Sequence, residues 1–117
     1  MKIVTGVDLV YLPRFTKALK SGGQDFLHRV FHESELTNQD TAHLAGIFAA
    51  KEAVMKALDL PKNSWHEVYV VHKASGAPKV EILHLTSSII NHSLSISHDG
   101  NYIIAQFTAI LKGNASS

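Results

Sequence analysis

The chain has 117 residues, of which 45% are hydrophobic and 18% charged, and its formal net charge is +1. This length and composition predict one folded domain, over residues 1–112, and exclude an intrinsically disordered protein. The absence of cysteine excludes disulfides, thiolate metal sites and cysteine nucleophiles. No stretch is long and apolar enough to span a membrane, and the first residues lack a signal-peptide pattern, so a cytoplasmic location is expected.

The first third of the chain predicts one strand and two short helices. Residues 2–11 are rich in β-forming apolar side chains and predict a buried strand. Pro13 suits the first turn of a helix, which we expect to continue to Lys20 and to end at the glycines that follow. A second short helix is expected over residues 25–31, and residues 32–36 predict a turn or a short helix.

The stretch that organises the rest of the chain is residues 43–58, which predict a long central helix. Alanines are frequent and apolar side chains recur at helical spacing, so one side of the helix should be buried. The helix should end near Asp59, because Pro61 cannot continue it. Glu52 and Lys56 are one turn apart and border the apolar side. They are a candidate site, and the alternative is an ordinary surface ion pair.

The second half of the chain predicts strands joined by turns. Apolar runs and alternating patterns indicate strands at residues 65–73, 79–83, 93–97 and 102–111. Residues 85–90 are ambiguous, and residues 113–117 are expected to form a loose tail. Together these elements predict an α+β domain, in which an antiparallel sheet of about four or five strands packs around one long helix and the first strand.

Three polar groups in this pattern suggest a site for a metal ion and phosphate. Asp8 stands among the apolar residues of the first strand, where a carboxylate needs a cation or a hydrogen-bond partner. Asp8 and Glu52 suit Mg²⁺, which usually takes one or two protein carboxylates and completes its shell with water and phosphate oxygens. Lys56 and His98 are donors of the kind expected around phosphates. The alternatives are that Asp8 caps a turn and that His98 fills a turn position.

A further feature is the positive charge between residues 13 and 29. This segment has a single acid, Asp25, and four cations that suggest a basic face for an acidic partner: Arg14, Lys17, Lys20 and Arg29. The alternative is an ordinary solvated helix face. Nucleic acid is not expected as a partner, because the chain has no dense cluster of lysine and arginine and no interleaved aromatic residues.

Five short motifs follow one another along the chain, at residues 6–10, 29–36, 44–57, 75–78 and 93–98. Their order and residues resemble the holo-acyl-carrier-protein synthase family, the small trimeric class of 4′-phosphopantetheinyl transferases. The helix motif follows the signature of that family nearly residue by residue. Each motif alone is unspecific, but five in the same order are specific. The resemblance covers most of the chain and implies the 4′-phosphopantetheinyl transferase fold.

The resemblance also implies a reaction and a set of site residues. Coenzyme A would bind with its pyrophosphate on Mg²⁺, a serine of acyl carrier protein would attack the β-phosphate, and adenosine 3′,5′-bisphosphate would leave. Residues matching Asp8 and Glu52 would hold the metal, and Lys56 would stabilise the developing charge. The base would be a metal-bound water or Glu35. The other coenzyme contacts implied are Gly76, Pro78, Ser97 and His98.

The partners follow from the same resemblance. Carrier proteins are acidic, so the basic face would be their docking surface, and binding there would weaken as the salt concentration rises. The basic face consists of Arg14, Lys17, Lys20 and Arg29. The family implies a homotrimer with active sites between subunits. That arrangement fits a chain too small to build a deep cleft within itself.

Three departures from the family pattern leave a rival function open. Ile47 stands where many members carry an arginine, and residues 59–64 replace a longer glycine-rich loop, in which Lys62 can compensate. The stretch between residues 83 and 93 is short enough to omit a helix. Weaker coenzyme binding, or a non-catalytic relative that binds carrier protein or coenzyme A, would follow. The chain retains four residues that argue against a non-catalytic role: Asp8, Glu52, Lys56 and His98. An unrelated nucleotide hydrolase is disfavoured, since the chain has no P-loop.

Overall fold

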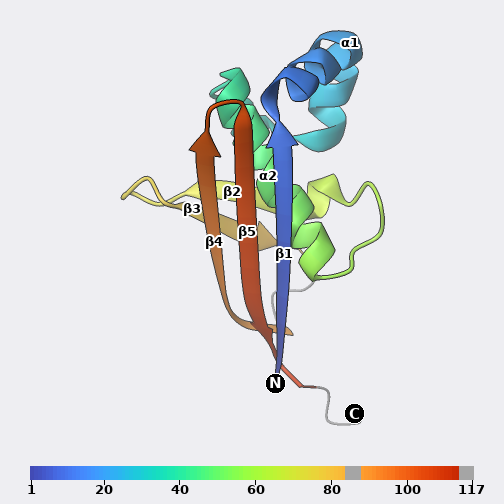
Figure 1. The fold of residues 1–117 in the computed structure, drawn as a ribbon. Helices are drawn as coiled ribbons and strands as arrows, with labels where there is room; N and C mark the ends of the chain where they lie inside the picture. The colour runs from blue at the N-terminus through green and yellow to red at the C-terminus, as the bar shows by residue number, and fades with distance from the viewer. Residues whose placement is uncertain (84–87, 114–117) are drawn as a thin grey trace.

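The computed structural model describes residues 1–83 and 88–113 and has two antiparallel sheets around one central helix (Figure 1). The larger sheet has the order β1-β5-β4, formed by β1 (Lys2–Tyr11), β5 (Tyr102–Leu111) and β4 (Ile89–Asp99). The smaller sheet is a hairpin of β2 (Val68–His72) and β3 (Pro78–Ile82). The α+β class is confirmed. The prediction of a single sheet is wrong, because β2 and β3, among the described residues, pair only with each other.

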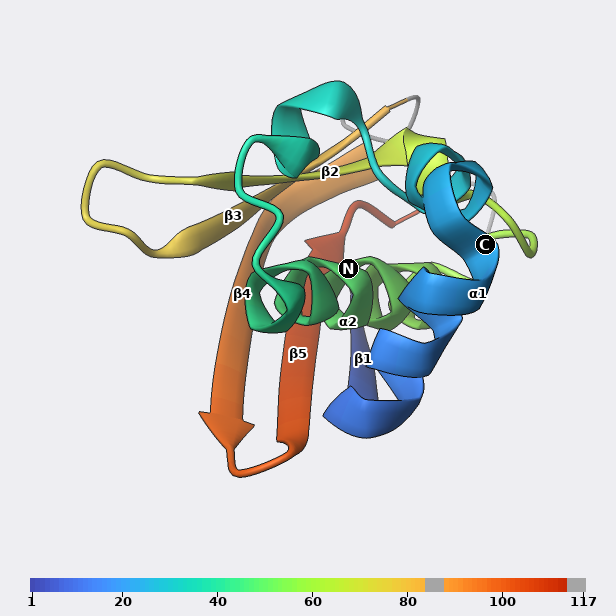
Figure 2. The ribbon, with the colours of Figure 1, turned by 90° about the horizontal axis from the view of Figure 1, so that it is seen from above.

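The central helix, α2 (Thr41–Ala57), lies between the larger sheet and the β2–β3 hairpin (Figure 2). Alanines form much of its surface and let the neighbouring strands come close, so the helix is buried nearly all round rather than along one stripe. Its first turn is capped by Asp40, whose carboxylate accepts from the His43 N–H at 3.3 Å. It ends shortly before the predicted end, and Asp59 follows with a left-handed backbone (φ 52°).

Helix α1 (Leu12–Val30) follows β1 directly and packs on α2. Its backbone is kinked at Gly23, where φ is 54° and ψ is −141°. Other residues rarely adopt this conformation, so the glycine bends α1 into the two short helices that the sequence predicts. Two 3-10 helices precede and follow α2, namely η1 (Glu33–Leu36) and η2 (Trp65–Glu67).

Strand β1 touches helix α2 at Gly6. A Cβ at this position would meet the backbone of α2, with the carbonyl oxygen of Ala53 nearest and the nitrogen of Ala57 2.9 Å away. Backbone cannot move aside as a flexible side chain can, so only glycine fits. The contact lies two residues before Asp8 on the strand and one residue after Glu52 on the helix.

The outer face of the larger sheet is exposed in the single chain. Side chains alternate along β1, so that Val10 packs in the core while Ile3, Val7 and Leu9 face outward with 71%, 51% and 61% of their surface exposed. The prediction of a buried first strand is therefore wrong for the isolated chain. Further large apolar side chains are exposed on the three strands of this sheet: Tyr11, Ile90, Tyr102 and Ile104.

Among the described residues, no helix has the length and apolar character needed to cross a membrane. Of the ambiguous segment 85–90, residues 85–87 lie outside the described part of the chain, and residues 89 and 90 begin β4. The question of a missing helix between residues 83 and 93 falls largely on the same undescribed residues. The predicted tail also lies outside, apart from Gly113.

Candidate active site

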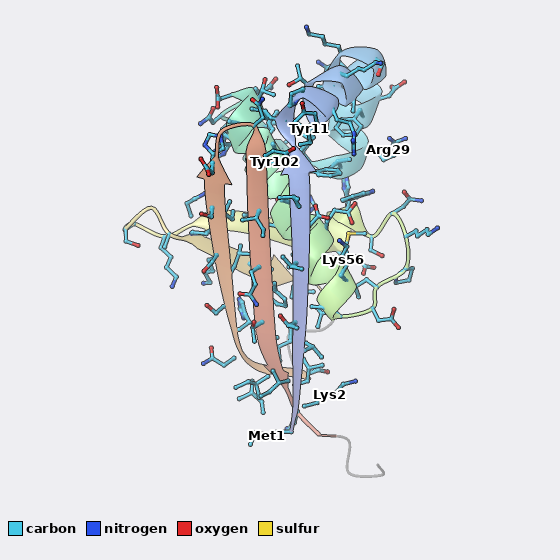
Figure 3. All side chains as sticks on the ribbon, in the orientation of Figure 1. Met1, Lys2, Tyr11, Arg29, Lys56 and Tyr102 are labelled. Carbon is cyan, nitrogen blue, oxygen red and sulfur yellow. The ribbon has the colours of Figure 1, made fainter. Side chains whose placement is uncertain are left out.

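The first part of the candidate site lies where β1 meets α2. Asp8 is on the same side of β1 as Gly6, and Lys56 reaches it from the last turn of α2, with 2.9 Å between Nζ and Oδ1. The Lys56 ammonium also donates to the carbonyl oxygen of Val7 at 3.1 Å. Figure 3 shows Lys56 beside the middle of the sheet. Glu52 is one turn earlier on the helix, close enough for the charge of Asp8 to act on it. We call Asp8, Glu52 and Lys56 the carboxylate cluster.

Burial raises the pKa of both carboxyl groups in the carboxylate cluster. Loss of water raises the pKa of Asp8, although the hydrogen bond and the charge of Lys56 act in the opposite direction. Burial likewise raises the pKa of Glu52, and the negative charge of Asp8 raises it further, again against Lys56. Two carboxylates facing one ammonium leave an excess of negative charge. Binding a cation would offset this charge.

The donor set of the carboxylate cluster fits a hard divalent cation such as Mg²⁺. The described residues contain no group of three or more histidine, cysteine or acidic side chains placed to hold a metal ion. Mg²⁺ needs only one or two protein carboxylates when water and phosphate oxygens complete its shell. Asp8 and Glu52 would therefore hold the ion together with a phosphorylated ligand.

Glu35 lies elsewhere, and the structure contradicts its predicted role as a general base. The residue is 3% exposed, and the Lys51 ammonium lies 2.6 Å from its carboxylate. The N–H groups of His32 and Val70 donate to the same carboxylate, both at 2.8 Å. A carboxylate enclosed in this way cannot reach a serine on a partner protein. It joins η1, α2 and β2 and so serves the fold.

Lys51 is the residue that the sequence analysis missed. It is 0% exposed, and its ammonium donates to the carbonyl oxygens of Val30 at 2.8 Å and Trp65 at 3.1 Å in addition to its ion pair with Glu35. All three donors of the ammonium are therefore used. The sequence contains a sign of this buried pair. Lys51 follows Ile47 by one turn and so stands on the apolar side of the helix, where an unpaired charge is costly.

His32 makes the surroundings of this ion pair sensitive to acid. Its ring stacks on Tyr69 with the centroids 3.5 Å apart, and its Nε2 is buried without a hydrogen-bond partner among the described residues. Burial lowers the pKa of His32, and the charge of Lys51 lowers it further, while the charge of Glu35 opposes this. As the pH falls, the unfolded chain therefore takes up a proton at His32 before the folded chain does.

We expect the contribution of His32 to make the free energy of unfolding fall as the pH drops below about 6.5, the usual pKa of histidine. His32→Phe keeps the stacked ring and removes the titration. The variant should therefore lose less stability than the wild-type chain between about pH 7.5 and 5.5, measured by urea denaturation. The carboxylates of Asp8 and Glu52 titrate in both proteins, so an identical pH dependence would exclude His32 as the cause.

The second part of the predicted site lines a cavity of about 350 Å³ beside the N-terminal half of α2, which we call the α2 cavity. Gly76, Pro78 and His98 contribute to its wall, and so does Ile47. Ser97 does not line the α2 cavity, because side chains alternate along β4 and that of Ser97 lies on the opposite face from His98.

The two parts of the site are separate in the single chain. Asp8 is on β1 and His98 on β4, which are the two edge strands of the larger sheet, with β5 between them. The α2 cavity shares no lining residue with the cavity beside Asp8. Lys62 does not compensate for Ile47 within one chain, because it is exposed beyond the opposite end of α2, and residues 47 to 57 alone rise about 15 Å along the helix.

The predicted basic face lies along α1. All four of its cations are exposed: Arg14, Lys17, Lys20 and Arg29. Figure 3 shows Arg29 on α1, beside the end of the sheet at which Tyr11 and Tyr102 lie. Arg14 also lines a cavity of about 260 Å³ together with Asp8 and the rings of Phe15, Phe26 and Phe48. The basic face and the carboxylate cluster therefore border the same cavity.

The family model of the 4′-phosphopantetheinyl transferase superfamily matches residues 5–107. The chain is 37% identical over 116 residues to a protein from Dehalococcoides mccartyi named holo-[acyl-carrier-protein] synthase, with 92% of this chain and 98% of that protein covered. A protein of the same name from Protochlamydia amoebophila is 36% identical over 116 residues, with 90% and 95% covered.

Solved structures with the same name share the fold. The Helicobacter pylori holo-[acyl-carrier-protein] synthase in complex with coenzyme A has a TM-score of 0.83 and 30% identity, covering 91% of this chain and 99% of that one. The Neisseria meningitidis protein has a TM-score of 0.81 and 29% identity, covering 92% and 97%. The sequence match spans the carboxylate cluster and His98 alike, and the fold agrees over most of the chain. The chain therefore belongs to the 4′-phosphopantetheinyl transferase superfamily, as a member of its holo-acyl-carrier-protein synthase family.

Proposed function

We propose that the chain transfers 4′-phosphopantetheine from coenzyme A to a serine of an apo acyl carrier protein, in a reaction that depends on Mg²⁺. The observation that carries this proposal is the carboxylate cluster, in which burial raises the pKa of Asp8 and Glu52 and Lys56 stands beside them. Such a cluster suits a diphosphate bound together with a divalent cation. Membership of the family points to coenzyme A as the source of that diphosphate.

Lys56 is the residue that we assign to the transferred phosphoryl group. Its Nζ is held by Asp8 and by the carbonyl oxygen of Val7, and 53% of its side chain remains exposed to a ligand. Negative charge on the phosphoryl oxygens changes during the transfer, and a cation already in place stabilises the transition state without reorganisation. When bound, Mg²⁺ would neutralise charge on the diphosphate.

A homotrimer with active sites between subunits is part of the proposal. The carboxylate cluster and the α2 cavity lie near opposite edges of the larger sheet, so a neighbouring chain could supply the part that the first chain lacks. A contact between two different edges is heterologous, and it forms a closed ring when the rotation between neighbouring chains closes. The exposed apolar outer face of the sheet offers the surface for such a ring, and the molar mass in solution tests it.

The basic face of α1 is the proposed docking surface for the carrier protein. Its four cations would attract an acidic partner, and the cavity beside Arg14 would take an apolar side chain of that partner next to the carboxylate cluster. This placement would bring the serine of the carrier toward the coenzyme. Binding through exposed charges should weaken as the salt concentration rises.

Arg14→Glu should raise the Michaelis constant for the carrier protein much more than the constant for coenzyme A. The substitution reverses one charge of the basic face and leaves Asp8, Glu52 and Lys56 unchanged. Lys112→Glu makes the same change of charge at an exposed position after β5 and serves as the matched control. Steady-state kinetics with each substrate varied in turn measures both constants. Equal effects on the two constants would contradict docking at Arg14.

Intact-mass spectrometry of an apo acyl carrier protein tests the proposed function directly. The carrier is incubated with the chain, coenzyme A and Mg²⁺, with a chelator added to a parallel sample. We expect the carrier to gain the mass of one phosphopantetheine only in the sample without chelator. If several carriers gain nothing while coenzyme A still binds to the chain, the transferase proposal fails and the non-catalytic relative is favoured.

A further inference from the structure

Helix α1 consists of two segments, and the second of them is short. The helical backbone is interrupted at Gly23, so residues 24–30 form a separate helix of about two turns. A helix of this length is marginal on its own and depends on contacts with the rest of the protein. Such contacts must therefore fix where residues 24–30 lie.

Two carbonyl oxygens in the last turn of α1 accept hydrogen bonds from other elements. Nε2 of His66, in η2, lies 2.7 Å from the carbonyl oxygen of His28, and it donates there because a carbonyl oxygen can only accept. The buried Lys51 ammonium donates to the carbonyl oxygen of Val30 at 2.8 Å. The last four carbonyl groups of a helix lack partners within it, so both bonds satisfy the end of α1.

Neighbouring rings support the imidazole of His66. The rings of His66 and His32 have their centroids 4.7 Å apart, and His32 in turn stacks on Tyr69 of β2. Trp65, the residue before His66, is buried, and its carbonyl oxygen accepts from Lys51 at 3.1 Å. His66 therefore donates from a supported position, although its side chain lies at the surface.

Residues 24–30 carry two parts of the proposed docking surface. The ring of Phe26 lines the cavity beside Arg14. The guanidinium of Arg29, a cation of the basic face, lies 5.8 Å from the centre of the Phe26 ring. The turn to which His66 donates therefore sets the position of one wall of this cavity and of a cation next to that wall.

Apolar packing alone does not fix this turn. Val30 is buried and Phe26 is half-buried, so residues 24–30 lie against the core. Burial of apolar surface is non-directional, and a short helix can keep it while rotating or sliding slightly. A hydrogen bond depends on distance and angle and so restricts these movements.

We propose that His66 is a positioning residue for the carrier protein, because its hydrogen bond to the last turn of α1 holds Phe26 and Arg29 in the arrangement that the carrier binds. This inference rests on the proposed function, in which α1 is the docking surface. His66 lines neither the α2 cavity nor the cavity beside Arg14. Its removal should therefore affect binding of the carrier and not the chemical step.

His66→Ala should raise the Michaelis constant for the carrier protein about threefold, and by no more than about tenfold, the worth of one hydrogen bond. The kcat and the Michaelis constant for coenzyme A should stay within about twofold of the wild-type values. His66→Gln keeps an N–H donor on a side chain of similar reach and should restore most of the affinity. His28→Gln leaves the accepting carbonyl oxygen in place and is the matched control.

Hydrogen exchange tests the same contact without any substrate. The amides of residues 24–31 should exchange at least about threefold faster in His66→Ala than in the wild-type chain, while those of α2 stay unchanged. Unchanged exchange in residues 24–31 would overturn the proposal. Faster exchange together with an unchanged Michaelis constant for the carrier would overturn it as well.

The fate of this proposal can be separated from that of the transferase. If the wild-type chain transfers phosphopantetheine and His66→Ala has the same Michaelis constant for the carrier, only the positioning role is refuted. If the wild-type chain binds an apo carrier without transfer, the transferase is refuted. The dissociation constant of the carrier, measured by calorimetry, then decides: a rise of about threefold in His66→Ala supports the positioning role, and equal affinity refutes it. If no carrier binds, both proposals fail.

Discussion

Replacing Glu52 with glutamine should stop transfer and, at the same time, raise the melting temperature. Burial and the charge of Asp8 raise the pKa of Glu52, so the ionised carboxylate is less favourable in the folded chain than in the unfolded chain. This cost to stability is present at neutral pH and disappears as the pH falls through the raised pKa of the folded state. Glutamine is nearly isosteric and uncharged, so Glu52→Gln removes the cost at neutral pH.

Transfer by Glu52→Gln should fall by about a hundredfold or more, because one of the two carboxylates that would hold the metal ion is lost. Mg²⁺ should raise the melting temperature of the wild-type chain and leave that of the variant nearly unchanged. Glu81→Gln, at an exposed carboxylate of β3, is the control and should alter neither activity nor melting. Thermal melts with and without Mg²⁺, together with the mass assay, measure these effects. A variant that keeps full activity would remove Glu52 from the site.

Lys51 and Lys56 are five residues apart on α2, and their replacement with methionine should have opposite consequences. Lys51→Met leaves the carboxylate of Glu35 buried without its cation, so the free energy of unfolding should fall by about 3–5 kcal/mol. Lys56→Met breaks an ion pair in which the lysine is 53% exposed and Asp8 15%, so the free energy of unfolding should fall by clearly less than in Lys51→Met. Its transfer activity should nevertheless be strongly reduced, because Lys56 is the cation beside the phosphoryl group.

Urea denaturation and the mass assay on both lysine variants give the comparison. Replacing both partners, as Lys51→Met with Glu35→Leu, should recover part of the lost stability, because no buried charge is then left unpaired. The N–H groups of His32 and Val70 still lose their acceptor, so the recovery should be incomplete. Equal stability of Lys51→Met and Lys56→Met would contradict the structural role of the buried pair.

Features with a strong local cause were predictable from the sequence. The run of β-formers from Lys2 to Tyr11 gives β1 its observed bounds. The glycines after Lys20 place the kink at Gly23. The meeting of Asp8 with Lys56 was predictable in a different way, because a carboxylate within a strand and a lysine at the border of a buried helix each need a partner.

Features that depend on distant parts of the chain were not predictable in the same way. Val7 and Leu9 are as apolar as core residues, but whether they are buried depends on what covers the outer face of β1, and the single chain leaves them exposed. The pairing of Lys51 depends on where η1 places Glu35, 16 residues earlier in the chain. Likewise, the division into two sheets depends on how β2 and β3 pass α2. The alternation of apolar and polar side chains along each strand does not determine that path.

In the proposed metal site, the contact at Gly6 would bear on which ions can bind. Strand and helix touch there through their main chains, so the spacing between the backbone positions of Asp8 and Glu52 is set by a rigid contact. Mg²⁺ binds oxygen at about 2.0–2.1 Å and tolerates little deviation, whereas Ca²⁺ binds at about 2.3–2.6 Å with more ligands. A spacing fixed at the distance that suits Mg²⁺ would disfavour the larger Ca²⁺. The missing side chain of one glycine would in this way contribute to discrimination between magnesium and calcium in the cell.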